Sequence, residues 1–380
     1  MKAKYVGNIA GTIGLCFLGV AAESEMPIAA HTHSQRKTIS WDRKTLTLIA
    51  EWGSYGRMIR LTSGNILCAF AKRGTVWTSR SIDEGKTWDA SAMAVKYKFG
   101  TATNPEILQL ANGWVLLSYN ERPRDGKNHF AIRTCLSKDV GQTWAAHSLV
   151  YEADTHWENG CWEPAQIQLP SGQIQLYFAN ENPYRHSNEQ EISMVRSEDN
   201  GLTWGKPTTI SFRAHHRDGM PVPLILNKGK GIVVALEDNT LHGKFRPAII
   251  CTSMKRNWNQ PYVDGSSPQR WWALARPLSP NVNVAAPYIR QFPGGETILS
   301  CQTNEGRKNP IMAVYLGDDE AKSFSGRTVP FNVDPGKAGR WNSLFIKSVT
   351  TVTAISGTTI NGVTGLWAID GQIIETCAEE

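Results

Sequence analysis

The chain has 380 residues, of which 41% are hydrophobic, 19% charged and 9% aromatic. This composition is typical of a folded globular protein and excludes a disordered, collagenous or coiled-coil chain. Forty Lys and Arg residues against 34 Asp and Glu residues give a net charge of +6, but no long basic run concentrates that charge. The sequence therefore does not indicate a nucleic-acid partner.

The N-terminus has the pattern of a secretory signal peptide. Lys2 and Lys4 precede a mostly apolar stretch from Gly7 to Ala22, which ends in small residues. We therefore expect a signal peptide over residues 1–22, an N-terminal extension over 23–40 and a catalytic domain over 41–380. No later segment has the roughly 20 apolar residues that a membrane span needs. These features predict a secreted or periplasmic chain without a membrane partner.

The cysteines do not follow a metal-binding pattern. No Cys-x-x-Cys pair and no histidine at metal-ligand spacing occurs, so neither a metal nor another cofactor is expected. Four cysteines lie in alternating apolar segments, where a small buried side chain is favoured over a disulfide, although export permits a bridge. These four are Cys68, Cys135, Cys251 and Cys301.

An eight-residue motif, Ser-x-Asp-x-Gly-x-Thr-Trp, occurs three times, at residues 81–88, 137–144 and 197–204. A degenerate fourth copy runs from Asp319 to Phe324. The motif predicts a tight turn between two strands, in which Ser and Asp cap backbone N–H groups and Gly takes a positive φ. About 59 residues separate the copies, so the mature chain has room for about six repeats.

Each repeat also contains alternating apolar segments without helical periodicity. The strand before each turn is predicted at Val76–Ser81, Phe130–Ser137 and Ile192–Ser197, and an earlier strand follows a Gly-containing turn. Four strands per repeat predict an all-β, six-bladed β-propeller. The repeated motif resembles the Asp box of the sialidase superfamily, which implies a sialidase-like propeller along nearly the whole mature chain. The motif names the fold and not the reaction.

The functional face of such a propeller is predicted to lie opposite the Asp boxes. In an up-and-down blade, the first strand begins on that opposite face, close to the central axis. Aligning the repeats on their strand 1–2 turns places five residues at equivalent entry positions, and Glu163 is the only acid among them: Tyr55, Asn104, Glu163, Pro221 and Ala286. The same alignment places Asn120 and Glu237 together at the end of the second strand.

Glu163 and Glu237 are thus predicted to point from neighbouring blades into one opening. Glycoside hydrolysis uses such a pair, in which one carboxylic acid protonates the leaving oxygen and the other attacks or activates water. Trp162 beside Glu163 is a candidate stacking surface for sugar. The other candidate substrate-binding residues are polar or aromatic groups expected on the same face: Arg57, Asn104, Asp218, Arg246, Tyr288 and Trp341.

A closer resemblance rests on Trp162-Glu163-Pro164, Gly219 to Pro223, Leu236-Glu237, Trp341 to Phe345 and Gly365 to Ile369. These segments resemble the exo-α-1,5-L-arabinanase family. The resemblance implies a retaining enzyme that releases arabinobiose from linear arabinan, with Glu163 as nucleophile and Glu237 as acid/base. It also implies an oligosaccharide or polysaccharide as partner, and we expect a monomer.

Two alternatives remain open. Tyr55 to Ile59 resembles the arginine element of sialidases, and Arg246 and Arg290 are possible partners for a substrate carboxylate. However, the loop Ala71 to Gly74 lacks the expected acid, and Arg290 is predicted inside a strand. A non-catalytic sugar-binding propeller is the other alternative, although its pockets repeat in every blade, whereas the acids here differ between blades.

Overall fold

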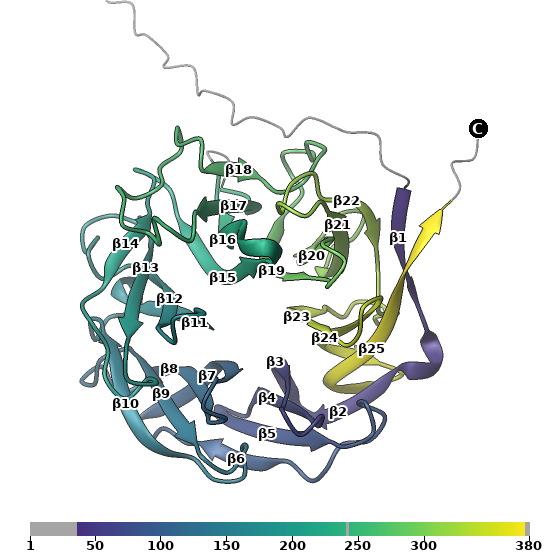
Figure 1. The fold of residues 1–380 in the computed structure, drawn as a ribbon, viewed down its shortest axis with the longest axis horizontal. Coiled ribbons are helices and arrows are strands. Elements are labelled where there is room, and N and C mark those ends of the chain that lie inside the picture. The colour runs from purple at the N-terminus through teal and green to yellow at the C-terminus, as the bar shows by residue number, and fades with distance from the viewer. Residues whose placement is uncertain (1–35, 241–242, 377–380) are drawn as a thin grey trace, which may run out of the picture.

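The computed structural model describes residues 36–240 and 243–376, which form six antiparallel sheets around a central axis (Figure 1). In each sheet the first strand of the repeat lies nearest the axis, and the later strands follow outward. The chain alternates short apolar strands with turns, so each sheet buries side chains against both neighbouring sheets. The prediction of an all-β, six-bladed β-propeller is confirmed.

The first three blades each contain four consecutive strands. Blade 1 consists of β3 (Gly53–Arg60), β4 (Ile66–Lys72), β5 (Thr75–Ser81) and β6 (Ala92–Val95). Blade 2 consists of β7 (Gly100–Gln109), β8 (Val115–Pro123), β9 (Ala131–Ser137) and β10 (Ala145–Glu152). Blade 3 consists of β11 (Cys161–Gln168), β12 (Ile174–Asn180), β13 (Glu191–Ser197) and β14 (Thr208–Ser211).

The next two blades follow the same order. Blade 4 consists of β15 (Asp218–Leu226), β16 (Gly231–Asp238), β17 (Arg246–Thr252) and β18 (Arg270–Trp272). Blade 5 consists of β19 (Val284–Gln291), β20 (Thr297–Thr303), β21 (Ile311–Gly317) and β22 (Ser325–Thr328). The described part of the chain also contains three short 3₁₀ helices: η1 (Arg43–Thr45), η2 (Trp157–Asn159) and η3 (Asn227–Gly229).

The sixth blade closes the ring with both ends of the described chain. It contains β23 (Arg340–Ile346), β24 (Thr351–Ile360) and β25 (Val363–Thr376) from the C-terminal part, and β1 (Arg36–Trp41) and β2 (Thr47–Glu51) from the N-terminal part. Both β1 and β2 pair with β25 in antiparallel register (Figure 1). The closing sheet therefore begins at Arg36, within the segment assigned to an extension, and the signal peptide expected over residues 1–22 lies outside the described residues.

The three Asp boxes form nearly identical turns between the third and fourth strands. In the first box, Ser81 Oγ accepts a hydrogen bond from the Gly85 N–H at 2.8 Å, and Asp83 Oδ1 accepts one from the Thr87 N–H at 2.9 Å. The strand 1–2 turn lies on the same face, because Arg60 contacts both Gly64 O and Glu84 there. The candidate site therefore lies on the opposite face, as the topology predicted.

The degenerate fourth box differs from its prediction by one residue. Asp318, and not Asp319, accepts hydrogen bonds from the backbone N–H groups of Glu320 and Lys322, both at 2.9 Å. Asp319 instead pairs with Lys230 at 2.6 Å. Phe324 is 1% exposed and supplies the buried ring of this turn.

Within residues 36–240 and 243–376, no helix is long and apolar enough to cross a membrane. The same residues contain no group of three or more His, Cys, Asp or Glu side chains placed to hold a metal ion. All five described cysteines are free. Cys68, Cys135 and Cys301 are fully buried in strands, as predicted, whereas Cys251 lies in β17 but is only partly buried.

Candidate active site

One residue in the innermost strand of every blade has a left-handed backbone conformation. At each of these positions the pairing register with the second strand shifts, which marks a β-bulge in the first half of the innermost strand. The six residues, with φ between 48° and 57°, are Tyr55, Asn104, Glu163, Met220, Ala286 and Trp341. Five of these strands were aligned from the sequence, but in blade 4 the bulge is at Met220, so the alignment of Pro221 was wrong by one residue.

The bulge gathers these side chains around the axis. Tyr55, Met220, Ala286 and Trp341 belong to one apolar cluster, and the rings of Tyr55 and Trp341 are 5.9 Å apart. Bulges commonly redirect side chains next to functional sites, because the extra residue breaks the alternation of the strand. Glu163 is the only acid among the six, as the sequence indicated.

The Glu163 carboxylate faces the guanidinium of Arg122. Arg122 Nη2 lies 3.9 Å from Glu163 Oε1 and donates a hydrogen bond to Asn104 Oδ1 at 2.6 Å. Its Nε donates to Asn120 Oδ1 at 3.1 Å, so Arg122 is fixed in place. Burial raises the pKa of Glu163 to about 7, although the charge of Arg122 opposes that shift.

Glu237 lies in the second strand of blade 4, opposite the residue that precedes the bulge of that blade. It pairs with Gly219 in register, as Asn120 pairs with Thr103 in blade 2, so the predicted equivalence of Asn120 and Glu237 is confirmed. Glu237 Oε2 accepts a hydrogen bond from the Ala286 N–H at 2.7 Å, which links the carboxylate to the bulge of blade 5. Burial, assisted by the negative charge of Glu163, raises the pKa of Glu237 to about 7.

A second pair of charged residues, missed in the sequence, lies near both glutamates. Arg217 donates hydrogen bonds to Glu181 and to Gln190 Oε1, the latter at 2.7 Å. The positive charge of Arg217 lowers the pKa of both Glu163 and Glu237, while Glu181 raises that of Glu163. Glu181 directly follows β12 and Arg217 directly precedes β15, and nothing in the sequence marks the two residues as partners.

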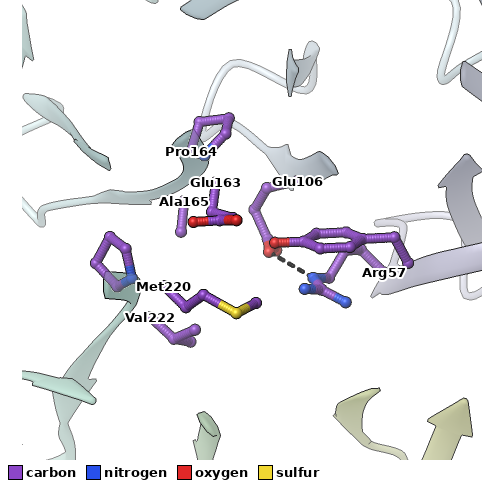
Figure 2. Close-up of a pocket in the computed structure, with 9 residues that line it drawn as sticks. Arg57, Glu106, Glu163, Pro164, Ala165, Met220 and Val222 are labelled. Carbon is purple, nitrogen blue, oxygen red and sulfur yellow. Dashed lines mark hydrogen bonds and ion pairs between the residues drawn. The ribbon is translucent and has the colours of Figure 1, made fainter. Parts of the chain in front are cut away.

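A pocket opens beside Glu163 and has about 200 Å³ of empty space, part of it open solvent. Figure 2 shows the Glu163 and Glu106 side chains and the Met220 thioether directed into this space. Its lining residues are Tyr55, Arg57, Glu106, Glu163, Pro164, Ala165, Met220, Pro221 and Val222. Glu237 does not line this pocket and lies beside it, between β15 and the Ala286 bulge.

The floor of the pocket contains a buried ion pair. Arg57 Nε donates to Glu106 Oε2 at 3.0 Å (Figure 2), and Tyr288 Oη donates to Glu106 Oε1 at 3.2 Å. Arg57, Glu106 and Tyr288 each lie two residues after a bulge residue. That constant offset is the sequence signal from which Glu106 could have been found.

Four of the predicted substrate-binding residues lie at or under this site. Arg57 lines the pocket, and Tyr288 packs under the Arg57 guanidinium, 4.6 Å from the ring centroid. Asn104 and Trp341 are bulge residues of the ring around the axis. Their roles in substrate binding stay predictions.

The other three do not point into the pocket. Trp162 is 6% exposed, and its ring packs against Phe130 and Trp157 while its Nε1 donates to Glu181 at 3.0 Å. The exposed ring of this cluster is Trp157, at 55%. Trp162 therefore has no free face for a sugar, and the predicted stacking role was wrong.

Asp218 and Arg246 are engaged within the fold. Asp218 is fully buried, and Arg270 donates hydrogen bonds to both of its carboxylate oxygens at 2.7 and 2.8 Å. Arg246 donates to the carbonyl oxygens of Phe245, Ser279 and Val282 and so fixes the loop before blade 5. The predicted substrate contact of Asp218 was wrong, because its buried partner Arg270 occupies both carboxylate oxygens. The contact predicted for Arg246, which is only partly buried, stays a prediction.

The arrangement brings together two carboxyl groups whose pKa values lie near neutrality. At neutral pH such a pair can hold one proton, whereas ordinary carboxyl groups are ionised. One group can therefore act as an acid while the other is ionised. Glu163 lines the concave pocket and Glu237 lies beside it, on the face of the propeller opposite the Asp boxes.

Comparison with known proteins identifies the family. A model of the BNR repeat-like domain matches residues 113–328, more than half of the chain, and the chain belongs to this family. No curated protein sequence matches the chain significantly.

Solved structures share the fold at low sequence identity. A protein of unknown function from Dyadobacter fermentans has a TM-score of 0.69 and 14% identity, over 88% of this chain and 99% of that one. A GH93 α-L-arabinofuranosidase of Fusarium graminearum, in complex with arabinobiose, has a TM-score of 0.68 and 17% sequence identity, over 87% of this chain and 97% of that one. A Penicillium chrysogenum α-L-arabinanase, also complexed with arabinobiose, has a TM-score of 0.68 and 17% sequence identity, over 87% of this chain and 98% of that one. Sialidases match with lower TM-scores, and at these identities the likeness is one of fold.

Proposed function

We propose that this chain is a secreted, exo-acting, retaining glycoside hydrolase that releases arabinobiose from linear α-1,5-L-arabinan. The observation that carries the proposal is the pair of partly buried glutamates, Glu163 and Glu237, which interact electrostatically and whose pKa values are both raised to about 7. Structural relatives that hold arabinobiose support the choice of sugar.

In the proposed mechanism, the Glu163 carboxylate attacks the anomeric carbon while the Glu237 carboxylic acid gives its proton to the leaving oxygen. Water then attacks the glycosyl–enzyme ester, and Glu237 takes the proton from that water. The surroundings favour this assignment. Arg122, 3.9 Å from Glu163, stabilises the ionised form of Glu163, whereas the charge of Glu163 favours the protonated form of Glu237.

A sialidase activity has less support. The guanidinium of Arg57 is already paired with Glu106, and Arg246 is bound to backbone carbonyls. A sugar-binding propeller without catalysis is also less consistent with the site, because the six bulge residues differ in every blade and only one is acidic.

Product analysis on debranched arabinan and on a sialoside tests the proposal. We expect arabinobiose from arabinan, with the α-configuration at the first moment of release by NMR, and no product from the sialoside. Glu163→Gln and Glu237→Gln should each lower kcat by about 10²-fold or more. Near-normal turnover by either folded variant would contradict the proposal.

Glu121→Gln is the matched control. Glu121 is also a largely buried glutamate, and its Oε2 accepts a hydrogen bond from Arg133 Nε at 2.7 Å, but it does not line the pocket. Its replacement should leave kcat on arabinan within about twofold, which separates loss of the catalytic groups from loss of any buried carboxylate.

A further inference from the structure

Trp157 is an exposed aromatic residue on the face of the propeller that carries the candidate site. It belongs to η2, in the connection that leads from β10 into β11, and so lies on the face opposite the Asp boxes. The residue is 55% exposed, whereas Phe130 and Trp162, which pack against its ring, are buried. Trp157 therefore provides the accessible surface of this aromatic cluster.

The ring of Trp157 is held in place despite its exposure. Its centroid lies 4.5 Å from that of Trp162 and 5.7 Å from that of Phe130. The backbone of this turn is closed, because the Gly160 N–H donates to Trp157 O at 3.3 Å and the Glu181 N–H donates to Gly160 O at 3.0 Å. A Cβ at position 160 would lie 2.1 Å from the Trp162 ring, so the glycine allows this packing. An indole fixed in this way loses little conformational freedom when a ligand packs on it.

Arg122 connects this ring to Glu163. The guanidinium carbon of Arg122 lies 5.5 Å from the centroid of the Trp157 ring, while its Nη2 lies 3.9 Å from Glu163 Oε1. These two contacts limit the distance between the ring centroid and that carboxylate oxygen to about 11 Å. A sugar chain whose reacting bond lies at Glu163 is therefore long enough to contact the Trp157 ring one or two residues away from that bond.

A single exposed aromatic ring is ordinary on a protein surface. The Trp157 ring differs because its orientation is fixed and because Arg122 places it beside a candidate catalytic group. The C–H groups of a sugar can pack on an indole and bury apolar surface, while its hydroxyl groups stay hydrated at the edge of the ring. The exposed surface of Trp157 therefore suits a sugar residue of a chain that is bound at Glu163.

We propose that Trp157 is a substrate-binding residue, on whose ring a sugar residue of the arabinan chain packs close to the cleaved bond. The inference rests on the proposed function in taking arabinan as the substrate. It adds a binding contact outside the pocket that Glu163 lines, and it assigns to that contact the strength with which the chain is held and not the chemical step.

Steady-state kinetics on linear arabinan separate this role from a structural one. Trp157→Ala should raise KM at least about fivefold and leave kcat within about twofold, because the lost contact is made equally in the ground state and the transition state. Trp157→Phe keeps an aromatic ring and should restore most of the lost affinity. The pH profile of kcat/KM should not shift in Trp157→Ala, since Arg122 and Glu163 keep their contact. A smaller rise in KM, no rescue by phenylalanine, or a fall in kcat with a shifted pH profile would each overturn the proposal.

Trp114→Ala is the matched control for the kinetics. Trp114 is also a partly exposed tryptophan with a cation at its ring, because Lys138 Nζ lies 4.3 Å from the ring centroid. It directly precedes β8 and so lies on the face of the Asp boxes. Its replacement should leave both KM and kcat within about twofold of the wild-type values. An equal rise in KM in this variant would contradict a contact made by Trp157 in particular.

Protection from chemical oxidation reports the contact without turnover. N-bromosuccinimide oxidises accessible indoles, and the mass of each peptide shows which tryptophan has reacted. Trp52 is the internal control, because it is 56% exposed and lies between blades 6 and 1, across the ring from blades 3 and 4 (Figure 1). In Glu237→Gln, saturating arabinotriose should slow oxidation of Trp157 at least about threefold and leave that of Trp52 unchanged. Unchanged oxidation of Trp157, or equal protection of both residues, would overturn the proposal.

The two proposals fail in different ways. Arabinan turnover is measured separately with the wild-type chain. Hydrolysis of arabinan without protection of Trp157 would refute this inference and leave the proposed function standing. Protection of Trp157 by arabinotriose, in a chain that does not hydrolyse arabinan, would refute the proposed function and leave the sugar contact of Trp157 standing.

Discussion

Replacing Glu163 by glutamine is expected to stabilise the protein at neutral and alkaline pH, although it removes a candidate catalytic group. Burial raises the pKa of Glu163 from its ordinary value of 4.5 to about 7 in the folded state. Between these two values the folded state holds more protons than the unfolded state, so stability falls as pH rises through this window. Below pH about 4.5 both states are protonated, and the cost vanishes.

The magnitude follows from the difference between about 7 and 4.5, which is about 2.5 pH units. At about 1.4 kcal/mol for each pH unit, ionised Glu163 costs the folded state about 3 kcal/mol above pH 7. The side chain keeps 18% exposure, so solvent screens part of this cost, and a gain of about 2 kcal/mol is a realistic expectation. The pKa of about 7 already includes the attraction of Arg122, so the loss of that contact needs no separate correction.

Urea unfolding of the wild type and of Glu163→Gln at pH values from about 4 to 8 measures the effect. The free energy of unfolding of the variant should exceed that of the wild type by about 2 kcal/mol at pH 8, and the difference should shrink toward zero at pH 4. Glu158→Gln, at an exposed acid five positions earlier, is the control and should change the free energy of unfolding by less than about 0.5 kcal/mol. A Glu163→Gln protein less stable than the wild type at pH 8 would refute the reasoning.

Three further predictions concern the pair of glutamates and the frame that holds them. The pH profile of kcat/KM on arabinan should be bell-shaped with apparent pKa values on either side of about 7, since the two carboxyls titrate as a coupled pair; a flat profile from pH 5 to 9 would argue against the pair. Arg270→Met should lower the free energy of unfolding by about 3–5 kcal/mol, because Asp218 and Asp238 lose their buried partner, and a loss below about 1 kcal/mol in urea unfolding would be inconsistent with that role. Ser137→Ala should cost about 1–2 kcal/mol, because the Gly141 N–H loses its 2.7 Å acceptor in a buried turn, while kcat stays unchanged; an effect on kcat alone would contradict a purely structural Asp box.

The fold could be predicted because its signals are local. The Asp box fixes its own backbone through hydrogen bonds between residues four apart, so its sequence alone specifies a turn between two strands. The recurrence of this turn fixes the strand count, and the up-and-down topology fixes which face carries the strand entries. The same logic located Glu163 and Glu237 without any knowledge of their contacts.

The site residues that sequence reasoning misassigned depend on contacts between distant segments. Asp218 is an acid at a strand entry, like Glu163, but its partner Arg270 lies 52 residues later and removes it from the pocket. Trp162 adjoins a candidate catalytic residue, yet the packing of Phe130 and Trp157 buries its ring. Burial and charge pairing across blades decide these roles, and a single sequence does not specify either.

The register error in blade 4 has a similar cause. Proline follows the bulge residue there, as Pro164 follows Glu163, but the alignment by turn length placed Pro221 at the entry position, whereas the left-handed residue is Met220. When the connection between strands 1 and 2 has a different form in one blade, an alignment based on that connection places the entry residue of that blade one position away. In blade 4 that connection includes the short 3₁₀ helix η3.

The central claim is that Glu163 and Glu237 act on the same bond of one bound sugar. Azide rescue tests this most directly, with Glu163→Gly and Glu237→Gly assayed on an aryl α-L-arabinobioside. In a retaining enzyme, azide enters in place of the lost nucleophile or in place of water, so we expect both variants to regain turnover, Glu163→Gly giving the β-glycosyl azide and Glu237→Gly giving the α-glycosyl azide. Two folded variants that keep wild-type turnover without azide, or that azide fails to rescue, would contradict the account.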